Sequence, residues 1–248
     1  MKRIDNIDLT LFKTVHSQTS DKDRTALLAV QRAVANRFGK YSYIEVGSHL
    51  GGTIQPHIVD ERCNGIYSID PRPEICADDR VSGKSEYIDN SSERMLRLLS
   101  EVEGGDVSKI TCLNSDAREV GANDIPCLPE LVFIDGEHTK EAALSDFNST
   151  RALADKGATI LFHDFSVVYL GIMEVCRLLK KEGVPHHAIK LGGSVFGVFF
   201  DLDLPKADPY LSKALRKNRL VLLCWKIEKW FKLTIRNPIR DRLRGKSK

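Results

Sequence analysis

The chain has 248 residues, a length that predicts one large domain or one domain with extensions. Hydrophobic residues make up 42% and charged residues 29%, which allows a sizeable core and excludes a wholly disordered chain. No apolar run approaches the roughly 18 residues of a membrane span, and the N-terminus carries no apolar signal segment. With six scattered cysteines that predict reduced, mostly buried thiols, we expect a cytoplasmic protein.

The net charge of +3 conceals an uneven distribution along the chain. Residues 212–248 contain 13 lysines and arginines against two acids, so this segment carries +11 and the remainder carries −8. An acidic body joined to a basic tail predicts a globular domain and a segment that meets an anionic partner.

Helical and strand-like segments alternate along the body. Residues 21–38 have the apolar spacing of a helix and are followed by Gly39, a residue typical of helix ends. Short apolar runs typical of buried strands cover 43–46, 65–69, 109–113, 131–134 and 158–162. Further helices are predicted near 52–62, 91–103, 139–154 and 166–182. This alternation predicts a parallel sheet covered by helices.

Two last apolar runs, 187–190 and 195–200, are separated by only four residues. No helix fits between them, so they predict an antiparallel hairpin at the sheet edge. The expected fold class is therefore α/β, a doubly wound Rossmann-like sheet with five parallel strands plus a C-terminal antiparallel hairpin. We expect three parts: a helical cap at 1–40, the sheet domain at 41–202 and a basic helical extension at 203–248.

Polar residues or glycines follow each of the five expected parallel strands. Ligands of open α/β sheets bind beyond the carboxyl ends of the strands. In strand order, these groups are Glu45, Gly47, Ser48 and Gly51; Asp70; Asp116 and Ala117; Asp135 and His138; and His163 and Asp164. Five such ends in sequence favour one cofactor crevice over unrelated helix caps.

The first strand end carries a recognisable pattern. Glu45-x-Gly47-x-x-x-Gly51 resembles the acid-x-Gly-x-x-x-Gly turn of class I S-adenosylmethionine-dependent methyltransferases, and the likeness extends over 41–202. The dinucleotide pattern Gly-x-Gly-x-x-Gly is absent, which disfavours the alternative of a nicotinamide-dependent oxidoreductase.

This resemblance implies S-adenosylmethionine as cofactor and a role for each residue of the crevice. Gly47, Ser48 and Gly51 would line its methionine end, with Glu45 near the amino group. Asp70 would hold the ribose, and Asp116 with Ala117 would contact the adenine.

The fourth and fifth strand ends support a finer resemblance. Asp135-Gly-Glu-His138 with His163-Asp164 is similar to the metal-dependent O-methyltransferase branch that includes macrolide-sugar and cephalosporin-biosynthesis enzymes. That branch usually has an acid where this chain has His163. We expect Asp135, His163 and Asp164 to meet at one divalent cation, Mg²⁺ or, given the histidine, Mn²⁺.

His138 is the expected general base, because an unperturbed imidazole titrates near pH ~6.5. The expected reaction is metal-assisted O-methylation of a hydroxyl on a sugar, glycan or glycosylated small molecule. We expect the acceptor pocket to be formed by residues 1–40, 71–90 and 165–170, which carry no recognisable motif.

Each of these residues also has a purely structural interpretation. His138 would then belong to a polar network at a helix start, and His163 would be a buried histidine bonded to backbone. Asp164 and Asp70 would be helix N-caps.

The basic tail leaves two interpretations open. Residues 214–248 mix leucines and tryptophans with basic residues, a composition typical of amphipathic helices on anionic membranes. In that case the protein would be located peripherally at the inner face of a membrane. Alternatively, the helix packs on the sheet or on a second subunit of a homo-oligomer. Nucleic acid is disfavoured, because the body is acidic and no RNA-binding motif is present. A non-enzymatic, membrane-associated scaffold is the third functional alternative.

Overall fold

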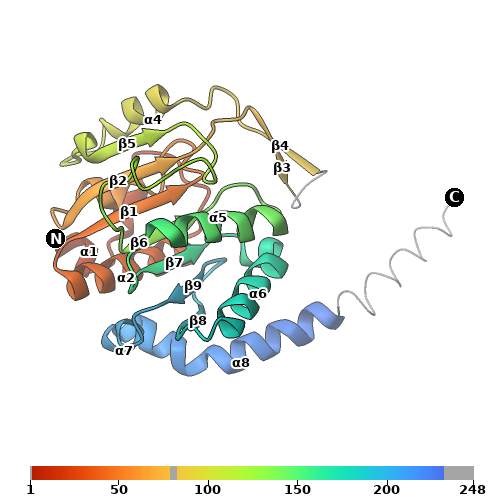
Figure 1. Ribbon diagram of the computed structural model, residues 1–248. Coiled ribbons are helices and arrows are strands. Elements are labelled where there is room, and N and C mark those ends of the chain that lie inside the picture. The colour runs from red at the N-terminus through yellow and green to blue at the C-terminus, as the bar shows by residue number, and fades with distance from the viewer. Residues whose placement is uncertain (1, 79–82, 232–248) are drawn as a thin grey trace, which may run out of the picture.

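A seven-stranded mixed sheet forms the centre of the computed structural model, which describes residues 2–78 and 83–231 (Figure 1). Its strands are β1 (Tyr41–Val46), β2 (Cys63–Ile69), β5 (Ile110–Leu113), β6 (Leu131–Ile134), β7 (Thr159–Phe162), β8 (His187–Lys190) and β9 (Phe196–Phe199). They lie in the order β5-β2-β1-β6-β7-β9-β8. The first five are parallel, and β9 runs antiparallel to both β7 and β8. The expected Rossmann-like, mostly parallel sheet is therefore confirmed.

A second, two-stranded sheet changes the predicted strand count. β3 (Ile75–Asp78) and β4 (Gly83–Glu86) pair antiparallel and project from the end of the main sheet (Figure 1). The search for buried apolar runs missed this hairpin because most of its residues are exposed and several are charged. Residues 71–90 are thus partly ordered as a sheet, where the sequence predicted none.

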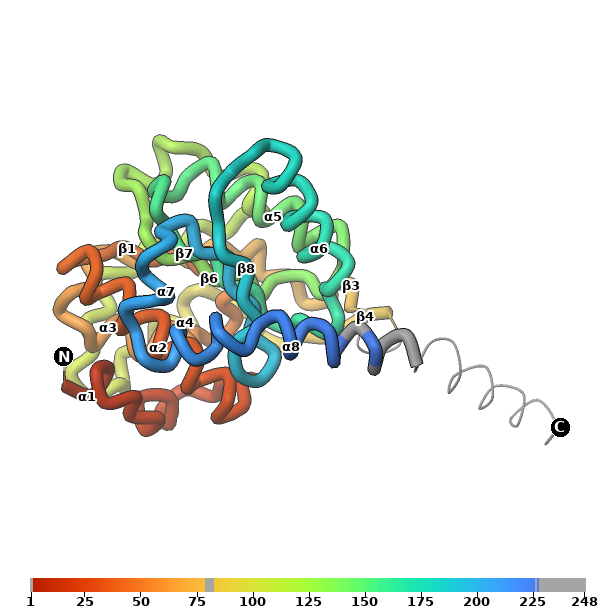
Figure 2. Tube along the Cα trace, turned by 90° about the horizontal axis from the view of Figure 1, so that it is seen from below, coloured from red at the N-terminus to blue at the C-terminus, as the bar shows by residue number. Residues whose placement is uncertain are grey.

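Helices cover both faces of the main sheet, as expected of a doubly wound fold (Figure 2). One face is covered by α2 (Asp21–Phe38), α3 (Gln55–Ile58), α4 (Ser92–Leu99) and α7 (Leu204–Ala207). The other is covered by α5 (Lys140–Leu153) and α6 (Phe165–Lys181). The short helical segments α1 (Lys2–Asp5), η1 (Leu9–Phe12) and η2 (Val107–Lys109) complete the body.

The N-terminal segment packs as part of the domain. Ala26, Val30 and Val34 of α2 are buried in the same core as Tyr41 and Tyr43 of β1. The boundaries drawn at residues 40 and 203 therefore stay a prediction of the sequence.

The helix predicted near 52–62 is wrong in length. α3 has only four residues and begins with Pro56 in its first turn. Before it, Gly52 packs so closely that a Cβ would lie 2.4 Å from the carbonyl oxygen of His16. After it, the Asp60 carboxylate accepts the backbone N–H of Arg62, which fixes a turn and not a further helical step. The prediction for the cysteines is right in part: within the described residues none of the six forms a disulfide, but only Cys63 is buried.

The last helix, α8 (Pro209–Phe231), crosses the edge of the sheet at β8. Leu211 near its start lies in the core of one face, whereas Trp225 packs against the core of the other. Asn218 closes the sheet edge by accepting the N–H of Lys190 and donating to the carbonyl of Ala188. None of the helices in the described ranges has the length and apolar content needed to span a membrane.

Candidate active site

The turn after β1 depends on Gly47. Its φ of +82° lies in the left-handed region that favours glycine. A Cβ atom here would lie 2.4 Å from the carbonyl oxygen of Asp135, so the ends of β1 and β6 touch backbone to backbone. Gly47 and Ser48 both line a pocket beyond the strand ends, where the resemblance places the methionine part of the cofactor.

Asp70 ties the end of β2 to this turn. Its Oδ2 accepts the backbone N–H of His49 at 2.9 Å, and its Oδ1 accepts that of Arg72 at 2.8 Å. Asp70 lines the pocket and precedes no helix, so the N-cap interpretation does not apply. Each carboxylate oxygen has a further lone pair, which leaves the group able to accept ribose hydroxyls.

Asp116 and Ala117 reach the pocket after β5. The Asp116 carboxylate is engaged by Arg118, with Nη2–Oδ2 and Nε–Oδ1 distances of 2.8 Å. Arg118 is 69% exposed, and a solvent-exposed pair of this kind contributes about 0–1 kcal/mol. Arg118 can therefore release Asp116 to an incoming adenine at small cost.

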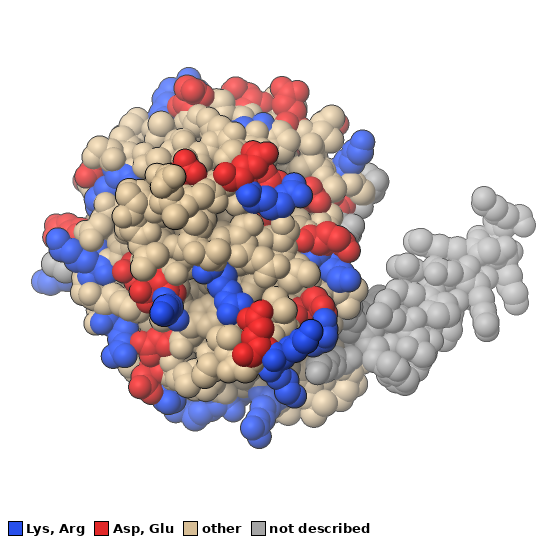
Figure 3. Space-filling view, in the orientation of Figure 1, with Lys and Arg blue, Asp and Glu red and all other residues tan. Residues whose placement is uncertain are grey.

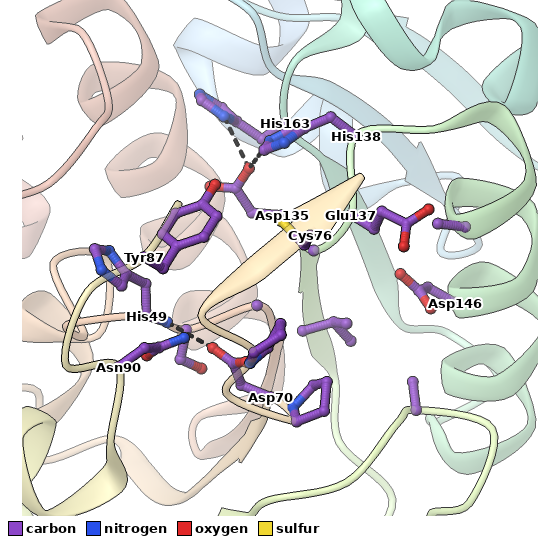
Figure 4. A pocket seen from close by; sticks show the side chains of 18 of the residues that line it. His49, Asp70, Cys76, Tyr87, Asn90, Asp135, Glu137, His138, Asp146 and His163 are labelled. Atoms are coloured by element: carbon purple, nitrogen blue, oxygen red, sulfur yellow. Dashed lines mark hydrogen bonds and ion pairs between the residues drawn. The ribbon is translucent and has the colours of Figure 1, made fainter. Parts of the chain in front are cut away.

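Asp146 on α5 was not singled out in the sequence, yet it lines the same pocket (Figure 4). Burial raises the pKa of its carboxyl to about 7, and the nearby Asp116 and Glu137 act in the same direction. Asp146 lies in the middle of a helix and away from any strand end, so the search for polar residues after strands could not identify it.

Glu45 and Gly51 lie behind the pocket wall and are not among the described residues that line it. The buried Glu45 carboxylate accepts hydrogen bonds from the hydroxyls of Thr53, at 2.6 Å, and Tyr43. Burial raises its pKa to about 8, against the opposing effect of these two bonds. A Cβ at Gly51 would lie 2.7 Å from Leu99, so both residues shape the turn from behind.

The pocket has a volume of about 440 Å³, which is in the range of small-molecule sites. Besides the strand ends, residues 16–19 and several positions between 71 and 90 line it, among them Cys76, Tyr87 and Asn90 (Figure 4). These are two of the three segments expected to shape the acceptor region. The third, 165–170, supplies none of the described lining residues.

His138 lies among three carboxylates, those of Asp78, Asp135 and Asp164, and Figure 4 shows it beside Asp135. Its Nε2 is 3.0 Å from Asp164 Oδ2 and 3.6 Å from Asp135 Oδ1. One ligand-type atom from each of Asp135, His138 and Asp164 lies within 4.8 Å of the others, which makes these three a candidate metal centre. Asp164 adopts the left-handed conformation with φ +45° and makes no side-chain cap bond to α6; its carboxylate faces His138 instead.

His163, expected as a metal ligand, is engaged on both sides of its ring. Nδ1 lies 3.0 Å from Asp135 Oδ1, and Nε2 lies 3.0 Å from the Ser194 hydroxyl and 3.7 Å from Asp23 Oδ2. Burial alone would lower the pKa of His163, but Asp135, Asp23 and Asp164 raise it to about 10. These partners are side chains and not backbone, so the interpretation of His163 as a histidine bonded to backbone is wrong.

Two further aspartates act on these histidines from distant parts of the chain. Asp78, fully buried at the end of β3, places Oδ2 3.4 Å from His138 Nδ1. Asp23 accepts hydrogen bonds from Ser20 through Oδ2 and from the backbone and hydroxyl of Ser194 through Oδ1. In the sequence, Asp23 is recognisable only as the N3 residue of a capping box that begins at Ser20. Asp78 lies in a segment without a motif.

Residues 44–165 match a family described as a methyltransferase domain. In this segment the chain is similar to a methyltransferase domain. The matched segment runs from β1 to the first residue of α6 and so includes every strand end described above. An uncharacterized protein of Acanthamoeba polyphaga mimivirus is 25% identical over 135 residues. That alignment spans 53% of this chain and 56% of the viral protein, so the chain covers about half the length of this relative.

The fold of the chain is similar to that of solved O-methyltransferases. The O-methyltransferase NovP superposes with a TM-score of 0.57 at 13% identity, covering 74% of this chain and 81% of NovP. CalS11, a TDP-rhamnose 3′-O-methyltransferase of calicheamicin biosynthesis, superposes with a TM-score of 0.51 at 14% identity, covering 80% of this chain and 85% of CalS11. At such identities these likenesses establish the fold alone.

Proposed function

We propose that the protein is an S-adenosylmethionine-dependent O-methyltransferase that acts, with a divalent cation, on a hydroxyl of a sugar, glycan or glycosylated small molecule. The observation that carries the proposal is that Asp135 and His138, two members of the Asp135–His138–Asp164 cluster, line the same pocket as the Gly47 turn. Methyl transfer is an in-line displacement, so donor and acceptor sites must be neighbours. The solved relatives named above include an enzyme that methylates a sugar nucleotide, which favours this acceptor class.

The cluster fits a divalent cation by the chemistry of its donors. Two carboxylates and one imidazole suit Mn²⁺ or Mg²⁺, and donors on opposite sides of one ion lie up to about 4.4 Å apart. The 4.8 Å limit of the three atoms needs only a small contraction to meet this. We therefore propose Asp135, His138 and Asp164 as the ligand set, in place of the set with His163. A bound cation would lower the pKa of an acceptor hydroxyl.

The remaining residues of the cluster position these three. His163 holds Asp135 through Nδ1 and is itself held by Ser194 and Asp23. Asp78 faces His138 Nδ1 and can accept a hydrogen bond from it, so that with a cation present the Nε2 lone pair would be left for the ion that Asp135 and Asp164 share. The same tautomer, with hydrogen on Nδ1, would suit the alternative role expected from the sequence, in which His138 Nε2 accepts the acceptor's proton.

Titration with S-adenosylhomocysteine followed by calorimetry tests the cofactor assignment, and absence of binding would reject it. Release of S-adenosylhomocysteine during turnover with a panel of nucleotide sugars and glycosides tests the acceptor class. Removing divalent ions with EDTA separates the two roles of His138. Loss of activity restored by Mn²⁺ supports the ligand role, whereas full activity in EDTA combined with an inactive His138→Ala variant supports the base role.

The two other functional alternatives have their own tests. An oxidoreductase would bind NADH, which quenching of intrinsic fluorescence detects. A non-enzymatic scaffold would keep its biological activity in His138→Ala and lose it on removal of 214–248, the reverse of what an enzyme predicts. The part of this segment from 232 onward lies outside the described residues.

A further inference from the structure

Helix α8 presents two different faces. The inner face carries Leu211, Leu215, Asn218, Leu222 and Trp225, which are buried or half-buried against the body. Trp225 anchors it, with its ring centre 4.0 Å from that of Tyr169 and 4.9 Å from that of Phe165. At 100° per residue these positions lie on one side of the helix, so the opposite side faces outward. The packing interpretation of the tail therefore describes only the inner face.

The outer face is basic first and apolar afterwards. Lys213, Arg216 and Lys217 are exposed on it, with Arg219 beside them, and Lys and Arg side chains gather along this lower edge of the molecule (Figure 3). One to three turns further on, Leu220 is 64% exposed, Leu223 55% and Ile227 57%. Together with Val221, these residues are four of the nine large exposed hydrophobics in the described chain. All four fall within the eight positions 220–227. Such clustering marks an interaction site, whereas single exposed leucines do not.

The charge of this region selects the partner. In the described part of the chain no acidic side chain pairs with Lys213, Arg216, Lys217 or Arg219. Nine more lysines and arginines follow Arg219 in the sequence, against Glu228 and Asp241 alone. A two-fold dimer would place this same basic patch against itself, which like-charge repulsion opposes. Nucleic acid would satisfy the charges but not the apolar residues.

We propose that the outer face of α8 binds the surface of an anionic lipid membrane. The leucines and Ile227 would insert at the level of the headgroups, and the basic residues would lie against lipid phosphates. Binding of this kind needs no membrane-spanning helix.

The position of α8 relative to the pocket gives this surface a consequence. Trp225 contacts Phe165, the residue directly after Asp164, so the far part of α8 lies at the same end of the sheet as the pocket. A membrane bound along α8 would therefore lie on the side of the molecule where the strands end. The proposal does not depend on which hydroxyl is methylated.

Flotation of the full chain with liposomes tests the proposal. We expect binding to phosphatidylcholine vesicles that contain about one third phosphatidylglycerol, little binding to pure phosphatidylcholine, and a decrease with added salt. The triple variant Leu220→Glu, Leu223→Glu, Ile227→Glu should lower the partition coefficient about 100-fold, and Arg216→Glu with Lys217→Glu more than about tenfold. Leu128→Glu, 59% exposed but outside α8, and Lys13→Glu with Lys40→Glu are the matched controls and should bind like the native chain.

Circular dichroism and affinity for S-adenosylhomocysteine establish that each variant is folded, because residues 213–227 do not line the pocket. Three results would overturn the proposal: no binding of the native chain to anionic vesicles, equal binding by the triple variant, or a dimer in solution that the triple variant converts to a monomer. Salt-sensitive binding to a random RNA with no vesicle binding would overturn it in favour of nucleic acid.

Discussion

The two halves of the pocket are built in different ways. The half after β1, β2 and β5 is made by backbone contacts: Gly47 allows one strand end to touch another, and Asp70 accepts the backbone N–H groups of His49 and Arg72. The half around His138 is made by long-range contacts, in which Asp23 and Asp78 from distant elements face the two histidines. The first half follows from spacing in the sequence, whereas the second depends on which distant side chains the fold delivers.

The largest expected effect on stability and on cofactor affinity comes from a change in the backbone half. Gly47→Ala must adopt a strained φ and also fit a Cβ 2.4 Å from the Asp135 carbonyl oxygen. We expect a loss of about 2–4 kcal/mol in the free energy of unfolding and about 100-fold in affinity for S-adenosylhomocysteine. Urea unfolding and calorimetry measure both quantities. Gly104→Ala, with φ +72° but no atom within 4 Å, is the control and should lose only about 1 kcal/mol.

His138→Ala addresses the long-range half. The variant removes the side chain that Asp78, Asp135 and Asp164 surround, so we expect kcat to fall about 10²–10⁴-fold with unchanged affinity for S-adenosylhomocysteine. Steady-state kinetics and calorimetry distinguish these effects. His186→Ala, at a histidine outside the pocket, should keep full activity. Equal activity of the two variants would remove His138 from the reaction.

A smaller effect is expected at the residue that positions His138. Asp78→Asn should lower kcat and Mn²⁺ affinity about 10–100-fold, because Nδ1 would lose its charged acceptor. Asp78→Glu should recover part of the loss, which a merely destabilised hairpin would not. Asp89→Asn, an exposed aspartate of the same segment, is the control. Unchanged kinetics in Asp78→Asn would show that Asp78 does not position His138.

The smallest expected effect is on the pH dependence of the free energy of unfolding, through Glu45, which lies behind the backbone half of the pocket. The pKa of Glu45 is raised from 4.5 to about 8, so the folded chain retains a proton that the unfolded chain has released. Its contribution to stability is therefore complete below pH 4.5 and is lost as the pH rises toward 8. Glu45→Gln cannot ionise and should flatten this slope, as urea unfolding at a series of pH values would measure. A slope that is equally steep in Glu45→Gln would assign it to other groups.

The sequence predicted the sheet and the strand ends because both depend on local patterns. Apolar runs located all seven strands of the main sheet, and the residues after them do gather at one end of it. The hairpin of β3 and β4 was not predicted, because its strands are short and polar. It is stabilised by its place over the pocket and by contacts such as the hydrogen bond from Ser85 to Asp78. The exposed half of α8 was anticipated by its composition, whereas its inner face was decided by packing on Phe165 and Tyr169.

The roles of the two histidines show where such prediction ends. Both His138 and His163 follow strand ends, and nothing in their immediate neighbours tells a ligand from a support. The difference arises from Asp23 and Ser194, which are 171 positions apart in sequence and meet beside His163. Only the folded chain brings that pair together.

A crystal structure with S-adenosylhomocysteine and Mn²⁺, with the metal located by its anomalous signal, tests the central claim most directly. We predict one Mn²⁺ ion bound by Asp135, His138 and Asp164, with the cofactor's ribose on Asp70 and its sulfur facing the ion. An ion bound through His163, or a cofactor placed away from the Gly47 turn, would contradict this account.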